Sequence, residues 1–385
     1  MKIVADENIP YAREAFGQLG EVETMAGRLM SADALRDAAA LFVRSVTKVD
    51  AALLEGTAVR FVGTATIGED HVDKAWLADQ GVGFSSAPGC NANSVGEYVA
   101  AALLFLAKAK GLRLQDCPLG VVGVGNAGSR VAEKAAALGL PLVLNDPPLA
   151  LEIGDERYRP IEEILDCGVI TLHVPLTRDG ADPTYHMVDE AFLERLKPGT
   201  IVINASRGAV VDNKALLAAL KSGRLGGAVL DVWEGEPDVD IDLLETVDIA
   251  TPHIAGYSFD GKVNGTRQIH EAACRFFGHT PTWDPEPLLP PPDRPEIEID
   301  GAQDWLDAIT QAVFAVYDIR NDDAAMRMLS TAPPAKRPAL FDQLRKDYPR
   351  RREFHNTRAL ATPPNPETNR TLQGLGFAVK ERVSP

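Results

Sequence analysis

The stretch Val121–Pro147, VVGVGNAGSRVAEKAAALGLPLVLNDP, decides the fold. Gly123, Gly125 and Gly128 follow a short apolar run and open a helical segment, and Asp146 comes at the end of the next apolar run. The first glycine permits a tight turn, the second leaves room for a pyrophosphate against the backbone, and the third lets helix and strand pack closely. The N-terminus of the helix supplies unpaired N–H groups and a partial positive charge.

Asp146 is expected to accept hydrogen bonds from the ribose hydroxyls of an adenosine and to repel a 2′-phosphate, which favours NAD over NADP. Asn126 and Ala127 stand between the second and third glycines and are expected to border the pyrophosphate. A glycine-rich turn followed by a surface aspartate is the alternative reading. Because the strand, helix, strand and acid occur here in the required order, the stretch predicts a dinucleotide site.

Short apolar runs alternate with helical segments around this motif. From Leu119 onward there are six such runs: LGVVGVG, PLVLNDP, GVITLHVP, GTIVINAS, GAVLDVW and VDIATPH. Continuous apolar strands joined by helical crossovers are typical of a parallel, doubly wound sheet. We therefore expect a Rossmann-type α/β nucleotide-binding domain at residues 95–256.

A second α/β layer is predicted at the N-terminus. Residues 1 to about 90 contain four candidate strands, MKIVADE, ALFVRS, VRFVGTATIG and VGFSSAP, with helical segments between them. An apolar helix expected over Asn93–Leu112 would link the two domains, and a helical stretch after Gly256 would carry the chain back to the first layer. We expect a discontinuous substrate (lid) domain at residues 1–94 and 257–284.

The C-terminal part begins with a change in amino-acid composition. The proline-rich stretch Asp284–Asp300 is interpreted as an extended linker. After it, an apolar stripe lies on roughly one helical face and includes Trp305, Ile309, Val313, Phe314 and Tyr317. Residues 285–385 are expected to form a small third domain, whose stripe can pack against its own subunit or against another.

Composition excludes several classes of protein. The net charge of −16 argues against a nucleic-acid partner. No apolar run reaches the ~18 uncharged residues needed to cross a bilayer, so no membrane association is expected. The four cysteines and seven histidines lack disulfide or metal-ligand spacing, which indicates reduced thiols in a cytoplasmic protein without a bound metal.

Three charged side chains follow the carboxyl ends of successive predicted strands. Arg207 stands in SRG after the strand Thr200–Ala205, Glu236 follows GAVLDVW, and His253 follows VDIATP. A guanidinium can bind a carboxylate through two parallel hydrogen bonds, and a carboxylate beside an imidazole supports an acid/base near neutral pH. A surface arginine and a core histidine are the alternatives, but the shared sheet edge favours a catalytic set.

The motifs together resemble those of the D-2-hydroxyacid dehydrogenase family over about residues 1–280. The resemblance is carried by GVGNAGSRVA, HVPLT, PTYHMVDEAFLERLKPGTIVINASRGAVVDNKALLAAL, GAVLDVWEGEP and TPHIAGYS. It implies that Arg207 binds the substrate carboxylate, that Glu236 pairs with the imidazole, and that His253 takes the hydroxyl proton while hydride passes to NAD. It also implies a flavodoxin-like substrate domain.

The resemblance assigns further residues. Cofactor contacts are implied, beside the glycine motif and Asp146, at Val174, Ser206, Arg207, Gly208, Asp231 and Gly256. Members that act on a phosphorylated sugar acid hold it at the positions of Ser45, Thr66 and Tyr257, and Arg44 is a reasonable supplement for the phosphate. The C-terminal module, of α+β type, is a homodimerisation domain in those members.

Two other functions remain open. The chain could be a sibling dehydrogenase for a different acid, such as phosphoglycerate, glycerate or hydroxypyruvate. It could also be a non-catalytic NAD sensor, as the C-terminal-binding-protein corepressors of this superfamily are. The basic run Arg350–Arg352 either reaches a substrate phosphate across a dimer or forms a solvated face, and a solvated face is the commoner use of such a run.

Overall fold

The computed structural model describes residues 1–379, which form two compact units. Unit 1 consists of Met1–Asn91 and Ser258–Pro290, and unit 2 consists of Ala92–Tyr257 and the described residues from Pro291 onward. The C-terminal residues thus cluster with the segment that carries the glycine motif. The three domain boundaries drawn from the sequence stay predictions.

Unit 1 is built on a five-stranded sheet in which every pairing is parallel and the strand order is β2-β1-β3-β4-β5. Its strands are β1 Lys2–Asp6, β2 Glu21–Met25, β3 Ala38–Val43, β4 Phe61–Thr64 and β5 Gly83–Ser85. This is the strand order of flavodoxin, so the predicted flavodoxin-like fold is confirmed.

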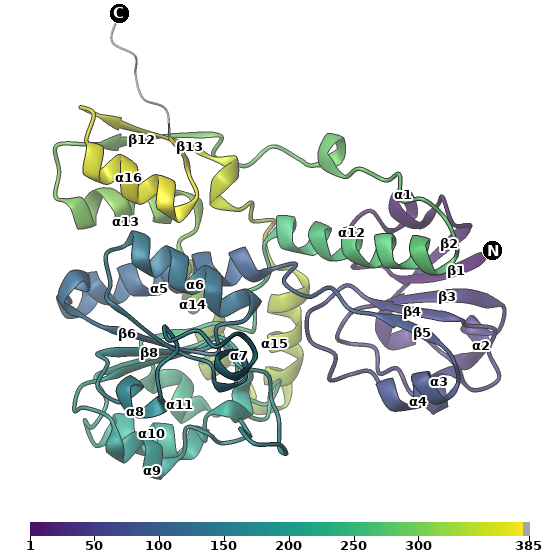
Figure 1. The fold of residues 1–385 in the computed structure, drawn as a ribbon, viewed down its shortest axis with the longest axis horizontal. Helices are drawn as coiled ribbons and strands as arrows, with labels where there is room; N and C mark the ends of the chain where they lie inside the picture. The colour runs from purple at the N-terminus through teal and green to yellow at the C-terminus, as the bar shows by residue number, and fades with distance from the viewer. Residues whose placement is uncertain (380–385) are drawn as a thin grey trace, which may run out of the picture. The chain divides into compact units, whose positions relative to one another are not determined.

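Helices cover both faces of the unit 1 sheet (Figure 1). They are α1 Ala12–Phe16, α2 Ala32–Leu35, α3 Ala51–Leu54, α4 Lys74–Asp79 and α12 Phe259–Phe276, with 3-10 turns at Gly27–Leu29 and Glu286–Leu288. One apolar cluster joins the sheet to α1 and α12, and a second joins its other face to α2, α3 and α4. Because α12 belongs to this unit, the chain returns to the first layer as the sequence predicted.

Unit 2 contains a six-stranded parallel sheet in the order β11-β10-β9-β8-β6-β7. The strands are β6 Leu119–Val122, β7 Leu142–Asn145, β8 Val169–Leu172, β9 Ile201–Asn204, β10 Gly227–Leu230 and β11 Ile249–Ala250. Residues of β6, β8, β9 and β10 are buried throughout, as expected for a sheet covered on both faces. The predicted doubly wound α/β sheet is confirmed.

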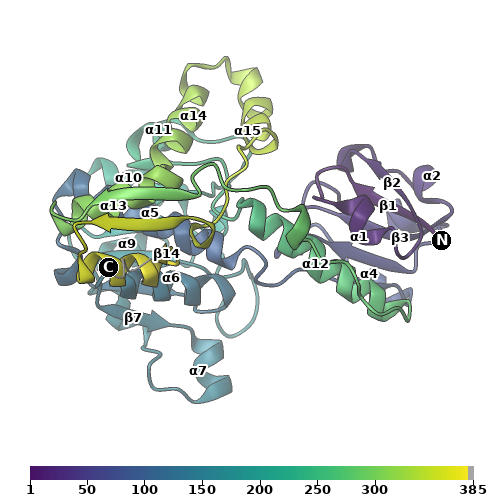
Figure 2. The same ribbon diagram turned by 90° about the horizontal axis from the view of Figure 1, so that it is seen from above.

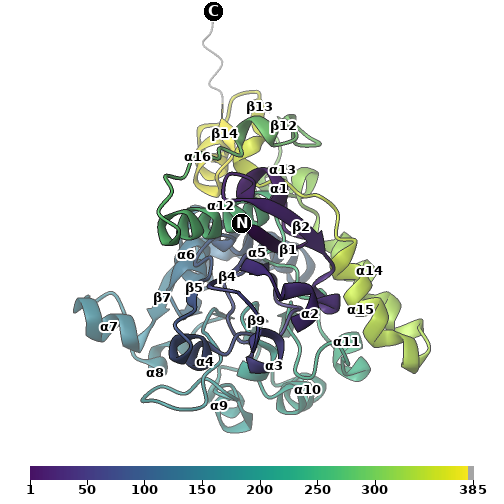
Figure 3. The same ribbon diagram turned by 90° about the vertical axis from the view of Figure 1, so that its right-hand side faces the viewer.

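The helices of this sheet are α5 Ala92–Lys110, α6 Asn126–Ala137, α7 Pro147–Ile153, α8 Ile161–Ile164, α9 Glu190–Arg195, α10 Asn213–Lys221 and α11 Ile241–Thr246, with 3-10 turns at Leu114–Asp116 and Gly208–Val210. Aspartates begin α9, α10 and α11, where each side chain accepts backbone N–H hydrogen bonds of the first turn. Strand β7 lies at the sheet edge, and α7 projects beyond it (Figures 2 and 3). The long helix predicted over Asn93–Leu112 is α5, which ends before the left-handed Gly111.

The C-terminal segment of unit 2 adds a three-stranded parallel sheet in the order β12-β13-β14. Its elements are β12 Glu296–Asp300, α13 Trp305–Val316, α14 Ile319–Thr331, α15 Arg337–Lys346, β13 Arg358–Thr362, α16 Pro366–Leu375 and β14 Ala378–Val379, with 3-10 turns at Pro334–Lys336 and Phe354–Asn356. Helices α14 and α15 form an antiparallel pair (Figure 2). The linker predicted up to Asp300 is wrong in its last part, because Ile297 and Ile299 alternate with acidic residues and form β12.

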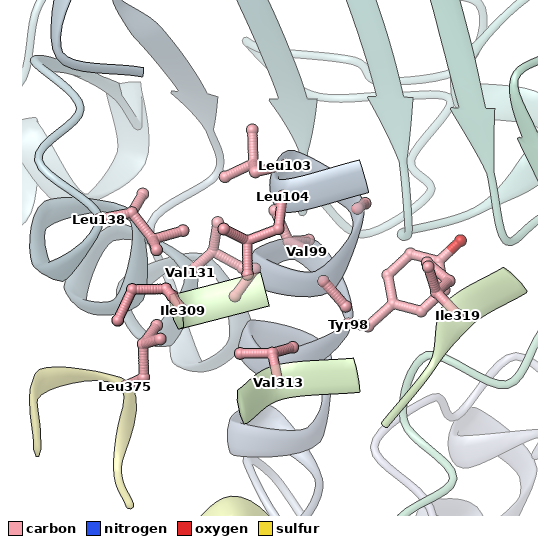
Figure 4. Close-up of a cluster of buried hydrophobic side chains, with 14 of the residues drawn as sticks. Tyr98, Val99, Leu103, Leu104, Val131, Leu138, Ile309, Val313, Ile319 and Leu375 are labelled. Atoms are coloured by element: carbon pink, nitrogen blue, oxygen red, sulfur yellow. The ribbon is translucent and has the colours of Figure 1, made fainter. Parts of the chain in front are cut away.

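The largest core of unit 2 joins the C-terminal segment to α5 and α6 (Figure 4). Ile309 and Val313 of the apolar stripe are fully buried there against residues that include Leu103 and Leu375. The stripe therefore packs mainly within its own subunit. Among residues 1–379, no helix is both long enough and apolar enough to cross a membrane.

Candidate active site

The candidate site gathers at the carboxyl ends of the unit 2 strands. The glycine turn follows β6, Arg207 follows β9, and His253 follows β11. The direction in which successive strands are added reverses between β6 and β8. Ligands of open parallel sheets bind at the carboxyl edge beside such a reversal, so the glycine turn occupies the expected place for a nucleotide.

Each glycine of the motif has the geometry that its predicted role requires. Gly123 has a φ of 83°, in the left-handed region that favours glycine. A Cβ added at Gly128 would lie 1.9 Å from the carbonyl oxygen of Gly123, whereas one added at Gly125 would meet no described atom within 4 Å. Helix α6 starts directly after this turn at Asn126, and no described side chain caps its first N–H groups. The turn therefore fits the pyrophosphate of NAD.

Asp146 ties the end of β7 to this turn. Its Oδ2 atom accepts a hydrogen bond from the backbone N–H of Val124 at 2.7 Å, and its Oδ1 atom accepts one from Leu149 at the start of α7 at 3.1 Å. Each carboxylate oxygen can accept a second hydrogen bond. The assignment of Asp146 to the adenosine ribose stays a prediction.

The SRG turn after β9 is fixed by its neighbours. Asn204 accepts hydrogen bonds from the backbone N–H and the hydroxyl of Ser206, at 3.1 and 2.8 Å, and donates one to the carbonyl of Arg207 at 3.0 Å. A Cβ added at Gly208 would lie 2.1 Å from the Trp233 carbonyl group. The turn thus packs directly on the backbone that leads to Glu236, which explains why glycine follows the arginine.

His253 and Glu236 meet in the structure. The Nδ1 atom of His253 lies 2.5 Å from Oε1 of Glu236, while Oε2 accepts a hydrogen bond from the Trp233 backbone at 3.2 Å. Burial alone would raise the pKa of Glu236, but the charge and hydrogen bond of His253, with the charge of Arg345, outweigh it and hold that pKa below its ordinary value. The predicted pairing of carboxylate and imidazole is present.

Asp231 shapes the loop that carries His253. Its carboxylate accepts hydrogen bonds from the Thr251 hydroxyl at 2.6 Å and from the backbone N–H groups of Ile254 and Ala255 at 2.7 and 3.0 Å. Burial raises the pKa of Asp231 despite these hydrogen bonds and the nearby charge of His253. His253 itself has a φ of 58°, so the loop holds it in an uncommon conformation. A cofactor contact of Asp231 remains a prediction.

The remaining positions assigned to unit 2 lie around these groups. Val174 follows β8, and its Cγ1 would lie 2.8 Å from a Cβ at Gly123. Gly256 and Tyr257 lie in the turn that follows His253, where the Tyr257 N–H donates to the Ile254 carbonyl at 2.8 Å. Val174 thus borders the glycine turn, and Gly256 and Tyr257 border His253.

Unit 1 carries a separate group of the predicted residues at the carboxyl ends of β3 and β4. Arg44 and the exposed Ser45 follow β3, and Thr66 follows β4 and donates to the Gly68 carbonyl at 3.0 Å. Burial, with the nearby charge of Arg44, lowers the pKa of Lys262 in α12 to about 8. Two cations therefore lie together at the sheet edge where the phosphate contacts were predicted.

No metal site is found in the part of the chain that the structure describes. Within residues 1–379, no group of three or more His, Cys, Asp or Glu side chains could hold a metal ion. All four cysteines of the chain are free thiols.

Two family models match the chain. The NAD-binding domain of the D-isomer specific 2-hydroxyacid dehydrogenases matches residues 102–255, and a domain of unknown function, DUF3410, matches residues 288–376. Erythronate-4-phosphate dehydrogenase of Salmonella arizonae is 49% identical over 378 residues, which cover 98% of each chain. The chain belongs to the D-isomer specific 2-hydroxyacid dehydrogenase family. Erythronate-4-phosphate dehydrogenase of Klebsiella pneumoniae is 48% identical, again over 98% of each chain.

Solved structures of other 2-hydroxyacid dehydrogenases have the same fold. Aquifex aeolicus D-lactate dehydrogenase, crystallised with NAD and lactic acid, is 25% identical with a TM-score of 0.61, over 72% of this chain and 95% of its own. Entamoeba histolytica 3-phosphoglycerate dehydrogenase with bound NAD is 26% identical with a TM-score of 0.62, over the same shares. This 2-hydroxyacid dehydrogenase thus shares its fold with proteins whose structures contain bound NAD.

Two features of this 2-hydroxyacid dehydrogenase are not evident from its sequence. Lys262 lies inside α12, and its part beside the charge of Arg44 is evident only from the structure. Two of the three residues in the basic run at 350–352 are not solvated: Arg351 and Arg352 are 7% and 8% exposed, while Arg350 is exposed. Arg351 donates hydrogen bonds to Glu97 at 2.8 Å and to Ser94 at 2.5 Å, both in α5.

Proposed function

We propose that the protein is an erythronate-4-phosphate dehydrogenase, which oxidises 4-phospho-D-erythronate to 2-oxo-3-hydroxy-4-phosphobutanoate in pyridoxal phosphate biosynthesis. The C2–H bond breaks with its electron pair, the hydroxyl O–H loses its proton, and a C2=O double bond forms. NAD, when bound, supplies the acceptor for the hydride. The observation that carries the proposal is the near full-length match to enzymes of that name, together with the contact between His253 and Glu236.

His253 is proposed as the group that takes the hydroxyl proton. Its Nδ1 atom faces Glu236, so the Nε2 atom is the nitrogen left for the substrate. As the ring becomes positive, the carboxylate at 2.5 Å stabilises the charge and keeps the ring oriented. The uncommon φ of His253 is held by the hydrogen bonds of Asp231 to the following residues, so the ring position is set before substrate arrives.

Arg207 is proposed to hold the carboxylate at C1 of the substrate. Its guanidinium already donates to the Ser206 carbonyl at 2.8 Å, which restricts the side chain at the sheet edge. A guanidinium at this position can bind a carboxylate in two parallel hydrogen bonds and polarise the oxygen on C2. In unit 1, Arg44, Ser45, Thr66 and Lys262 are proposed for the 4-phosphate, supported by the charge gathered beside Arg44.

The residues proposed to hold NAD are those of the glycine turn, with Asp146, Val174, the turn 206–208, Asp231 and Gly256. The open space at Gly125 and the uncapped start of α6 support this assignment. A homodimer through the C-terminal segment is also proposed, since β12 lies at a sheet edge and leaves one row of backbone groups unpaired within that sheet. Free thiols throughout support a cytoplasmic location.

A turnover assay tests the activity directly. Purified protein is given 4-phospho-D-erythronate and NAD, with a 2-oxo acid present to reoxidise any cofactor that stays bound, and the 2-oxo product is measured. 3-Phosphoglycerate and glycerate serve as comparison substrates. The proposal expects kcat/KM to be highest for 4-phospho-D-erythronate, whereas preference for another acid would assign the protein to a sibling activity. No turnover of any acid, with NAD still bound, would favour a sensor.

A further inference from the structure

Arg345 lies beside the candidate active site although it belongs to the C-terminal segment. It is in the last turn of α15, and its guanidinium carbon lies 5.7 Å from the ring centre of Tyr257 and 6.0 Å from that of Phe341. A guanidinium stacked on aromatic rings gains both packing and electrostatic attraction. Tyr348, two residues beyond the end of α15, meets the same Tyr257 ring edge to face at 5.9 Å. Two residues of the segment therefore contact the Tyr257 ring.

The charge of Arg345 also acts on the catalytic pair. It favours the ionised form of Glu236, whose other partner is His253 at 2.5 Å. In return, Glu236, Tyr257 and Asp231 act together to keep Arg345 positive, so its pKa is raised although burial opposes this. The Nε atom of Arg345 is buried and has no hydrogen-bond partner among residues 1–379. The side chain is thus held by packing on the aromatic rings, by the surrounding charge and by a side-chain hydrogen bond with Tyr257.

The groups that face this cation come from separate parts of unit 2. Glu236 and Asp231 follow β10, His253 and Tyr257 lie in the loop after β11, and Tyr348 follows α15. Burial raises the pKa of the Tyr348 phenol beyond its ordinary value, so this tyrosine is neutral around pH 7. Two carboxylates and one imidazole therefore act together with this guanidinium, and Asp322, which accepts a hydrogen bond from the Tyr348 hydroxyl at 3.1 Å, is a further carboxylate whose charge acts on Asp231.

We propose that Arg345 is a positioning residue of the acid/base site, which holds Tyr257 in place beside its guanidinium and sets the charge around the His253–Glu236 pair. This deepens the proposed function and rests on it, since it gives the C-terminal segment a part in the same reaction. During oxidation the imidazole must first be neutral to accept a proton. A positive charge nearby opposes early protonation of the pair and still leaves Glu236 ionised to stabilise the imidazolium once it forms.

Three variants separate charge from stacking. Arg345→Gln removes the charge, and Arg345→Lys keeps it but cannot stack as a flat guanidinium. Lys346→Gln removes the same charge from the neighbouring exposed residue of α15 and is the matched control. For each variant, kcat and KM are measured across pH with 4-phospho-D-erythronate and NAD. The titration midpoint of the His253 imidazole is measured by NMR without substrate.

The proposal expects Arg345→Gln to move the acidic limb of kcat/KM and the His253 midpoint to higher pH by roughly 0.5–2 units, because the pair then binds its proton more tightly. Arg345→Lys should restore the limb while KM stays raised severalfold, and Lys346→Gln should match wild type. An Arg345→Gln limb and midpoint equal to those of wild type would overturn the proposal.

Failure of the inference can be told from failure of the proposed function. If wild-type protein does not oxidise 4-phospho-D-erythronate, the function is wrong, while the substrate-free NMR midpoint still decides whether Arg345 sets the charge of the pair. If Arg345→Gln does not fold, the pH profile and KM of Arg345→Lys alone test the role of Arg345. A shifted limb or an unchanged KM in a folded Arg345→Lys variant would contradict the assignment.

Discussion

The Nδ1 atom of His253 lies 2.5 Å from Oε1 of Glu236, although the two residues follow different strands of the unit 2 sheet. In the proposed mechanism, this contact leaves Nε2 as the ring nitrogen for the substrate. The carboxylate is held in turn by the Trp233 backbone, and Trp233 donates its indole N–H to the Thr251 carbonyl at 3.0 Å. The proposed acid/base pair is therefore held by hydrogen bonds from the loops after both β10 and β11.

Replacing Glu236 by Gln tests the charge of this pair. An amide of the same shape cannot stabilise the imidazolium, so kcat should fall by about tenfold or more and the acidic limb of the pH profile should move to lower pH. Steady-state kinetics across pH provides the measurement. Glu234→Gln is the control, because Glu234 faces another histidine, His186, at 2.6 Å. Equal losses in both variants would contradict the specific role of Glu236.

Two alanine substitutions in the glycine turn should have opposite consequences. Gly128→Ala forces a Cβ to within 1.9 Å of the Gly123 oxygen and should lower the melting temperature. Gly125→Ala meets no described atom and should keep that temperature, but it should weaken NAD binding by filling the space expected for pyrophosphate. Calorimetric unfolding and NAD titration distinguish the two. Unchanged NAD affinity in Gly125→Ala would remove the pyrophosphate from this turn.

The pKa of about 8 at Lys262, lowered by burial and by Arg44, predicts a pH effect on substrate binding. Lys262 loses its proton as the pH rises through about 8, so KM for the phosphorylated acid should increase above that pH, and Lys262→Met should abolish this increase. Without ligand, Lys262 holds its proton more often in the unfolded chain than in the folded chain between about pH 8 and pH 10.5. The free energy of unfolding should therefore rise with pH in that window. Lys48→Met, which alters an exposed lysine paired with Asp50 at 2.7 Å, is the control. A pH dependence of KM that persists in Lys262→Met would argue against its role.

Arg351 should matter for stability. Its removal in Arg351→Met takes away the hydrogen-bonded cation of the buried Glu97 and leaves only the charge of Lys134 nearby, while burial and Glu353 already raise the pKa of Glu97 to about 8, so the free energy of unfolding should fall by roughly 1–3 kcal/mol. Urea denaturation measures the change, and Arg350→Met provides a control at an exposed neighbour. Adding Glu97→Gln to Arg351→Met should recover part of the loss. A double variant no more stable than Arg351→Met would show that the buried charge is not the cause.

Much of the nucleotide site was predictable because its signal is local. Gly123 and Gly128 report backbone constraints that any residue with a Cβ would violate, and these constraints hold wherever the loop lies. His253 and Glu236 were predictable from topology, since both follow parallel strands whose ends share one edge. Such inferences need no knowledge of side-chain packing.

Features that depend on distant packing were not predictable. Arg351 stands in a basic run that resembles a solvated face, and only the fold brings Glu97 to it across more than two hundred residues. Arg345 likewise meets Tyr257 through the placement of α15. Strand β12 was hidden by the proline-rich stretch that precedes it, although Ile297 and Ile299 carry the alternation of a half-buried strand.

The most direct test compares His253→Ala with wild type for NAD binding and for oxidation of 4-phospho-D-erythronate. General acid–base catalysis contributes about 10²–10⁴-fold, so turnover should fall by that order while NAD affinity and the melting temperature stay close to wild type. Retention of wild-type turnover by the folded variant would contradict the account, because the proton would then have another acceptor.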